Sequence, residues 1–159
     1  MIVTTINVNG IPHQELHCVE CPKEPFYDQV YEWFPGRTYQ NVLIVGAASG
    51  WKTFGDFLAA AKAKPGQLNF SSAGIGSGTH FNLEKLKIAT GIDVAHIPYK
   101  GTPEAIADTI GGRVCCYWAP LNAALPHVNG GKALALAVSS AQRSPLLPNV
   151  PTVAEQGYP

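Results

Sequence analysis

The chain has 159 residues, enough for one domain with a hydrophobic core or for a small domain with an appended segment. Its formal net charge is zero, which argues against nucleic-acid binding because such binding needs a basic surface. No apolar run approaches the roughly 20 residues of a membrane span, and no export signal is recognisable at the start of the sequence. We therefore expect a soluble α/β protein.

The first part of the chain, residues 1–50, is expected to form an appended segment. Ile2–Val8 alternates and is β-branched, which predicts a strand that ends at the turn dipeptide Asn9-Gly10. The polar stretch that follows is expected to be a loop, and apolar residues at helical spacing predict a helix from Phe26 to Phe34. The apolar run Asn41–Gly46 predicts a second strand, which leads into a turn of small residues.

The four cysteines fall into two pairs. Cys18 and Cys21 make a Cys-x-x-Cys motif with two histidines just upstream, which could hold zinc. A closed zinc site usually needs a second pair of ligands at matched spacing, and none follows. Cys115 and Cys116 lie in an apolar run, where adjacent residues of a strand point to opposite faces. We therefore expect reduced structural thiols, no metal site and no cofactor.

From Thr53 onward, predicted helices and strands alternate. Thr53-Phe-Gly-Asp56 predicts a capping box at the start of a helix that presents one apolar face. Such alternation predicts right-handed crossovers and an α/β fold of three layers, a mostly parallel sheet with helices on both faces. The later elements are predicted as strands over 68–70, 94–99, 113–119 and 133–139, and as helices over 79–90, 103–110 and, in part, 120–128, where Pro126 is expected to interrupt the helix.

A glycine- and hydroxyl-rich loop follows the predicted strand that ends at Phe70, and a helix starts directly after it. Backbone N–H groups and the positive end of the helix dipole converge in such a loop, which suits an anion. A glycine-rich connection without a ligand is the alternative. Ligands of parallel sheets bind beyond the carboxyl ends of the strands, where the loops after Phe70, Pro98 and Trp118 would meet. This arrangement predicts a small-anion site, for a carboxylate.

Several side chains near these strand ends have both a binding and a structural interpretation. His80, on the first turn of the predicted helix, could donate to the anion or be a surface histidine. Lys100 could supply positive charge or be a solvated turn lysine, and Trp118 could stack on a ligand. His96 is flanked by apolar residues and is expected to be a core histidine. No Ser-His-acid constellation stands out, so we expect no hydrolase.

A series of motifs runs through the second part of the chain: Phe57-Leu-Ala-Ala-Ala-Lys-Ala-Lys-Pro-Gly66, Phe70-Ser-Ser-Ala-Gly-Ile-Gly-Ser-Gly-Thr-His80, His96-Ile-Pro-Tyr-Lys-Gly101, Gly111-Gly-Arg-Val114, Ala124-Leu-Pro-His127 and Gly131-Lys-Ala-Leu-Ala-Leu-Ala137. Together they resemble the tripartite tricarboxylate transporter substrate-binding proteins, the Bug-type periplasmic receptors. The resemblance covers residues 51–159, which are therefore expected to form a carboxylate-receptor lobe.

This resemblance implies one lobe of a type II periplasmic-binding-protein fold, in which two α/β lobes close on a small organic anion. It implies non-catalytic binding of a small organic acid in the periplasm, with membrane transporter subunits as partners. Cys115 stands where the family commonly has an aspartate, which puts in doubt any polar contact made there. The residues implied to hold or line the carboxylate are Ser71, Ser72, Gly74, Gly76, Ser77, Thr79, His80, Tyr99, Lys100 and Gly101.

The match to the second lobe alone leads us to expect that the first lobe and its export signal are missing from this chain. An exposed sheet edge where first-lobe contacts are lost would make a homodimer possible. The other half of the cleft would then come from a partner lobe or from a second copy.

The first segment resembles a different family. Four of its motifs are similar to the start of spermidine-synthase-like proteins, which are Rossmann-fold aminopropyltransferases with methyltransferase-like relatives. The motifs are Asn9-Gly-Ile-Pro-His-Gln14, Glu24-Pro-Phe-Tyr-Asp-Gln-Val-Tyr31, Pro35-Gly-Arg37 and Val42-Leu-Ile-Val-Gly-Ala-Ala-Ser-Gly50. The acidic residue expected about 20 residues after the glycine turn has no counterpart here. A transferase fragment, or a spliced product of two family fragments without selected activity, is therefore the alternative to a receptor lobe.

Overall fold

The computed structural model describes residues 2–8, 11–17 and 40–158, and the chain divides into two units, residues 1–38 and 39–159. In the first unit, β1 (Ile2–Val8) pairs with β2 (Ile11–His17) as an antiparallel hairpin in which Val8 faces Ile11. The strand predicted over 2–8 is confirmed, whereas residues 11–17 form a second strand rather than the expected loop. The helix predicted from Phe26 to Phe34 and the Cys18–Cys21 pair lie outside the described residues.

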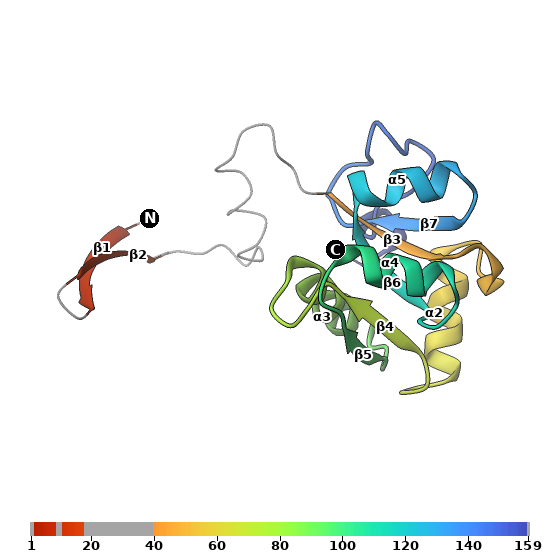
Figure 1. Cartoon of the computed structure of the whole chain (residues 1–159), viewed down its shortest axis with the longest axis horizontal. Helices are drawn as coiled ribbons and strands as arrows, with labels where there is room; N and C mark the ends of the chain where they lie inside the picture. Colours follow the sequence, from red (N-terminus) through yellow and green to blue (C-terminus); the bar gives the residue numbers. More distant parts are fainter. Residues whose placement is uncertain (1, 9–10, 18–39, 159) are drawn as a thin grey trace. The chain divides into compact units, whose positions relative to one another are not determined.

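The second unit is built on a five-stranded sheet in the order β5-β4-β6-β3-β7 (Figure 1). β4 pairs in parallel with β5 and β6, and β3 pairs antiparallel with β6 and β7, so β3 runs against the other four strands. As predicted, four of the five strands run in one direction; β3 runs the other way and makes the sheet a mixed one. The strands are β3 (Asn41–Gly46), β4 (Asn69–Ser72), β5 (Ala95–Pro98), β6 (Cys116–Pro120) and β7 (Ala133–Val138).

Helices cover both faces of this sheet, as the alternation predicted. Side chains of α2 and α3 pack into one core cluster, and side chains of α4 and α5 pack into a second cluster on the other face. Figure 1 shows α4 and α5 together over one side of the strands. The helices are α2 (Phe54–Ala63), α3 (Gly78–Thr90), α4 (Thr102–Ile110) and α5 (Leu121–Asn129), with short 3-10 turns at Ala47–Ser49 and Ala154–Gln156.

The start of α2 confirms the predicted capping box. The Thr53 hydroxyl accepts a hydrogen bond from the Asp56 N–H at 3.1 Å, and the Asp56 carboxylate accepts one from the Thr53 N–H at 2.9 Å. These bonds, with a third from Lys52, hold the pKa of Asp56 below its usual value. The predicted apolar face of the helix is the buried one.

The expected interruption at Pro126 is not observed, because α5 continues through this residue.

The strand β3 corrects the expected domain boundary. Its residues were assigned to the appended segment, but β3 lies between β6 and β7 inside the sheet of the second unit. Leu43 and Val45 are buried against one helical layer, and Val42 and Ile44 are buried against the other. An apolar run with no alternation is what a central strand covered on both faces requires. The division between the units therefore falls after residue 38.

The direction of β3 also determines which chain segments meet at the carboxyl edge, meaning the edge of the sheet where β4, β5, β6 and β7 end. Asn41, the first residue of β3, pairs with Pro120 at the end of β6. The Gln40 carbonyl accepts a hydrogen bond from the Leu121 N–H at 2.8 Å. The chain therefore enters this unit at the carboxyl edge.

No helix in the described part of the chain has the length and apolar character needed to cross a membrane.

A core truncation in β3 tests its place in the sheet. Leu43 is fully buried and faces Trp118 of β6, so Leu43→Ala should lower the free energy of unfolding by about 2–5 kcal/mol. Urea denaturation followed by tryptophan fluorescence measures the change. Leu146→Ala is the matched control because Leu146 is 63% exposed, and it should change stability by no more than about 0.5 kcal/mol. Equal, small effects of both variants would contradict the assignment of β3.

Candidate functional site

The predicted anion loop lies at the carboxyl edge, between Ser72, the last residue of β4, and Gly78, the first residue of α3. We call residues 73–77 the β4–α3 loop. Gly74 and Gly76 have φ angles of 128° and 79°, a region that residues with a side chain rarely adopt. A Cβ on Gly74 would also lie 3.4 Å from the Tyr99 carbonyl oxygen of the neighbouring turn. Glycine is thus required at both positions by backbone conformation.

Backbone N–H groups at the start of α3 remain available. Ser77 is the N-cap, and its hydroxyl accepts a hydrogen bond from the His80 N–H at 3.3 Å. The N–H groups of Gly78 and Thr79, the first two helical positions, have no acceptor among the residues that the structure describes, and the Ile75 N–H has none there either. Unpaired donors at the positive end of a helix form a favourable environment for an anion.

The hydroxyl groups of the loop are bonded to the loop itself. The Ser77 hydroxyl donates to the Gly74 carbonyl at 2.7 Å, and the Thr79 hydroxyl accepts from the Ala73 N–H at 2.9 Å. The Ser72 hydroxyl accepts from the Gly74 N–H at 3.1 Å. The two hydroxyls of Ser77 and Thr79 lie 2.9 Å apart. These side chains fix the shape of the loop, so that the free donors it presents are backbone N–H groups.

Two histidines lie against this loop. The rings of His80, on α3, and His96, on β5, stack with centroids 4.2 Å apart and planes 13° apart. The Gly76 N–H donates to His80 Nδ1 at 3.2 Å, and His96 Nε2 lies 2.6 Å from the Ser72 hydroxyl. Burial lowers the pKa of His96, and the neighbouring His80 lowers it further. Both rings therefore belong to the hydrogen-bonded framework of the site.

The turn after β5 borders the loop, as predicted. The Tyr99 N–H donates to the Ser72 carbonyl at 2.9 Å, which places residues 99–101 beside the β4–α3 loop. The Tyr99 hydroxyl donates to Asp108 of α4 at 2.7 Å, and this bond raises the pKa of Tyr99 and lowers that of Asp108. Arg113 pairs with the same carboxylate. Lys100 is exposed and has no ion-pair partner within residues 40–158.

Two predicted site residues lie elsewhere. Ser71 is fully buried, and its hydroxyl donates to the Cys116 carbonyl at 3.2 Å and lies 3.4 Å from the Thr109 hydroxyl of α4. Because neighbouring residues of a strand point to opposite faces, Ser72 faces the histidines and Ser71 does not. Trp118 is 2% exposed and packs in the core cluster with α2 and α3, so it is not placed to stack on a ligand.

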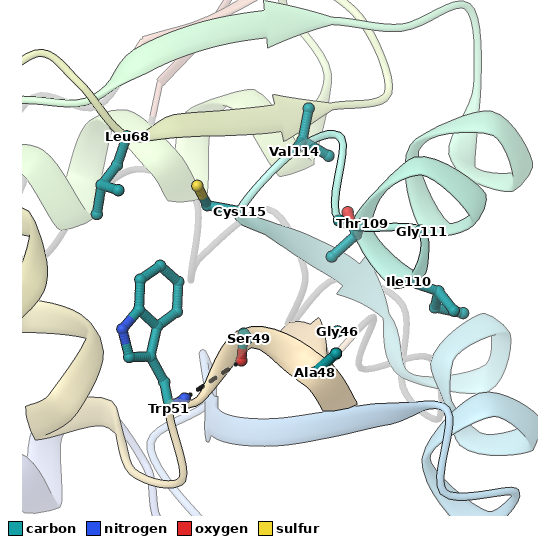
Figure 2. Close-up of a pocket in the computed structure, with 11 residues that line it drawn as sticks. Gly46, Ala48, Ser49, Trp51, Leu68, Thr109, Ile110, Gly111, Val114 and Cys115 are labelled. Atoms are coloured by element: carbon teal, nitrogen blue, oxygen red, sulfur yellow. Dashed lines mark hydrogen bonds between the residues drawn. The ribbon is translucent and has the colours of Figure 1, made fainter.

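A separate cavity of about 330 Å³ lies at the opposite edge of the sheet, where β3 ends and β4 and β6 begin. The Trp51 indole and the Cys115 thiol project into the same space (Figure 2). Its wall contains no charged side chain. The cavity is lined by Gly46, Ala48, Ser49, Trp51, Leu68, Thr109, Ile110, Gly111, Gly112, Val114 and Cys115. It is distinct from the loop, and its lining offers no positive charge to a carboxylate.

Comparison with known proteins identifies the family. A model described as the tripartite tricarboxylate transporter family receptor matches residues 27–159. The chain belongs to this receptor family. Among curated relatives, it is 40% identical over 118 residues to the protein BugT of Bordetella pertussis and 38% identical over 119 residues to a protein of Cupriavidus necator encoded in the gbd 5' region. The alignments cover 74% and 75% of this chain but 36% of each relative.

Solved receptor structures share the fold of the second unit. The R. palustris protein Rpa4515 with adipate superposes with a TM-score of 0.73 at 32% identity, covering 76% of this chain and 40% of that one. MatC from Rhodopseudomonas palustris with bound malate gives 0.72 at 26% identity, covering 76% and 41%. The periplasmic binding protein BugD gives 0.71 at 29% identity, covering 75% and 40%. The lobe architecture expected from the motifs is therefore confirmed.

The family match also corrects the interpretation of the first segment. It includes residues 41–50, which had been compared with spermidine-synthase-like proteins. These residues form β3 and the 3-10 turn after it, inside the receptor sheet. The transferase interpretation has no support in the structure or in the relatives described above.

The N-cap of α3 can be tested by substitution. Ser77→Ala removes the oxygen that accepts from the His80 N–H, so it should lower the free energy of unfolding by about 1 kcal/mol. Thermal or urea denaturation of the whole chain gives the value. Ser77→Thr keeps a capping oxygen and should recover most of the loss, and Ser140→Ala, in an exposed turn, serves as a control. A fully stable Ser77→Ala protein would show that the cap does not hold this helix start.

Proposed function

We propose that residues 39–159 form one lobe of a non-catalytic solute receptor, in which the β4–α3 loop binds one carboxylate group of a small organic acid. The observation that carries this proposal is a set of N–H groups, at Ile75, Gly78 and Thr79, that have no acceptor within residues 40–158, while the nearby hydroxyl groups are already bonded. Adipate and malate in the two R. palustris structures support a carboxylic acid as the class of ligand.

The roles of the predicted residues follow from their contacts. The N–H groups of Gly78 and Thr79 would bind the carboxylate oxygens, while Ser72, Ser77 and the Thr79 hydroxyl hold the loop in shape. Hydrogen bonds to a charged group are shorter and stronger than neutral ones, which suits a site of few donors. Lys100 would add long-range attraction from the neighbouring turn. Ser71 has no direct role because its hydroxyl faces α4.

The cellular setting is also a proposal. The chain spans 36% of the length of the curated relatives described above, so this lobe would complete its cleft with a further lobe. By its family, we propose that the protein acts in the periplasm and presents its ligand to the membrane subunits of a tripartite tricarboxylate transporter. A single lobe buries less of a ligand than a closed cleft, so its affinity should be low.

A ligand screen tests the proposal directly. Adipate, malate and citrate are titrated into the full chain by calorimetry and by thermal shift, with 1,6-hexanediol as the uncharged counterpart of adipate. An acid present at 100 times its Kd should stabilise the fold by about 2.7 kcal/mol, and the diol should have no effect. The absence of binding by every acid tested would refute the proposed function.

A backbone substitution tests the loop as the binding site. Gly78 is the first residue of α3, where proline is tolerated, so Gly78→Pro removes one N–H donor while keeping the helix. The extended conformation of Ser77, with φ −73° and ψ 158°, also suits a residue before proline. Affinity should fall about tenfold or more, because a hydrogen bond to a charged group contributes roughly 1.5–3 kcal/mol.

Gly78→Ala is the matched control for this experiment because alanine keeps the N–H group. It should bind the acid with nearly the affinity of the unmodified chain, and circular dichroism should show both variants folded. If Gly78→Pro binds as tightly as Gly78→Ala, the Gly78 N–H makes no contact with the ligand and the site is assigned wrongly.

A further inference from the structure

We infer that carboxylate binding at the β4–α3 loop is coupled to protonation of the His80–His96 pair: the lobe takes up a proton with its ligand and binds more tightly as the pH falls from 8 to 6. The inference rests on the proposed function of the loop. It gives a role to His96, expected from the sequence to be a core histidine, and a more specific role to His80, expected either to donate to the anion or to be a surface histidine.

The geometry joins both rings to the loop. His80 lies in the first turn of α3 and His96 on β5, and their rings stack at 4.2 Å between centroids. Each ring holds one end of the loop, through the Gly76 N–H at 3.2 Å and through the Ser72 hydroxyl at 2.6 Å. A change in the charge of either ring therefore acts directly on Gly76 or Ser72, which lie close in the chain to the residues that present the free N–H donors.

The bond from Gly76 to His80 requires a neutral ring. A neutral imidazole can accept at Nδ1 only if its proton is on Nε2, whereas an imidazolium has a proton on both nitrogens and accepts nothing. Protonation of His80 therefore breaks this bond and releases the Gly76 N–H. The released N–H joins the free donors of Ile75, Gly78 and Thr79, and a positive charge appears beside them.

The surroundings disfavour a positive charge on the pair when no anion compensates it. Burial lowers the pKa of His96, and the neighbouring ring of His80 lowers it further. Charged groups on α3 also act on His96: Glu84, which lies 3.8 Å from His80 Nε2, raises its pKa, and Lys87 lowers it. Because Lys87 is itself paired with Glu84 at 3.3 Å, these two charges largely offset each other.

A bound carboxylate reverses this balance. Its negative charge favours an imidazolium, and it accepts the N–H that His80 gives up, so binding raises the proton affinity of the pair. Linkage is reciprocal, so lower pH must tighten binding by the same free energy. The stacked rings repel each other when both are charged, which limits the uptake to one proton. A change of about one pKa unit on binding corresponds to about tenfold in affinity.

Calorimetry of the full chain with adipate tests this inference. Titrations at pH 8, 7 and 6, above the usual carboxyl pKa of roughly 4, are done in two buffers that differ in ionisation enthalpy. The expected results are about tenfold tighter binding at pH 6 than at pH 8, and uptake of up to one proton near pH 7. Equal affinity across this range, with no proton uptake, would overturn the inference and leave the proposed function intact. Failure of adipate to bind at any pH would overturn both.

Two variants replace each ring by a group that keeps its hydrogen bond but does not titrate. His80→Asn keeps an acceptor near the position of Nδ1, and His96→Gln keeps an amide near the position of Nε2. Whatever their affinity at pH 8, they should lose most of the proton uptake and the pH dependence. His127→Gln, on α5, is the matched control and should retain both. If His80→Asn and His96→Gln each keep the full pH dependence, another group takes up the proton.

A second readout does not depend on a ligand. Nitrogen chemical shifts of the imidazole rings should show His80 as the Nε2–H tautomer at pH 8, because Nδ1 accepts from Gly76. Adding adipate at pH 7 should shift one ring of the pair toward the imidazolium. The Nδ1–H tautomer for His80, or rings that stay neutral with adipate bound, would contradict the mechanism.

Discussion

The parallel pairing of β4 with β5 determines the chemistry available at the carboxyl edge. Its register places Ser72 beside Pro98, so the Tyr99 N–H reaches the Ser72 carbonyl and His96 reaches the Ser72 hydroxyl. The β4–α3 loop is therefore bordered by a second turn and by an imidazole from the neighbouring strand. Without this pairing, the loop would be a glycine-rich connection with no fixed neighbours, and neither the histidine stack nor the approach of Lys100 would follow.

The serine and threonine hydroxyls around the β4–α3 loop make the loop rigid, because they form hydrogen bonds within it. The hydroxyls of Ser72, Ser77 and Thr79 bond to loop atoms, and the N–H groups of Gly78 and Thr79 have no acceptor in the part of the chain that the structure describes. A loop already held in its binding shape loses little conformational entropy when the ligand arrives. In the proposed site, serine and threonine would hold the N–H donors in place rather than bind the ligand themselves, and glycine at positions 74 and 76 permits the backbone angles of the loop.

Features that depend on neighbouring residues in the sequence could be predicted, whereas features that depend on contacts between distant segments could not. The capping box of α2 and the loop before α3 are local patterns, and both were predicted correctly. The opposite orientations of Ser71 and Ser72 follow from strand alternation, so the assignment of both serines to one site could have been corrected from the sequence. The place of β3 could not be inferred from its apolar run, since any strand covered on both faces has that composition. The His80–His96 stack joins two elements whose pairing only the folded sheet defines.

The reversed direction of β3 links the fold to the use of the site. Because β3 starts at the carboxyl edge, the chain enters the lobe at the same edge as the loop that we propose binds the carboxylate. A further lobe connected there would approach the loop and not the cavity at the opposite edge. Its approach would remove water from the N–H donors and from the histidine pair, and interactions between charges strengthen as water is excluded. The approach of a further lobe and the uptake of a proton would then both favour the carboxylate-bound lobe, since both act on the few residues between Ser72 and His80.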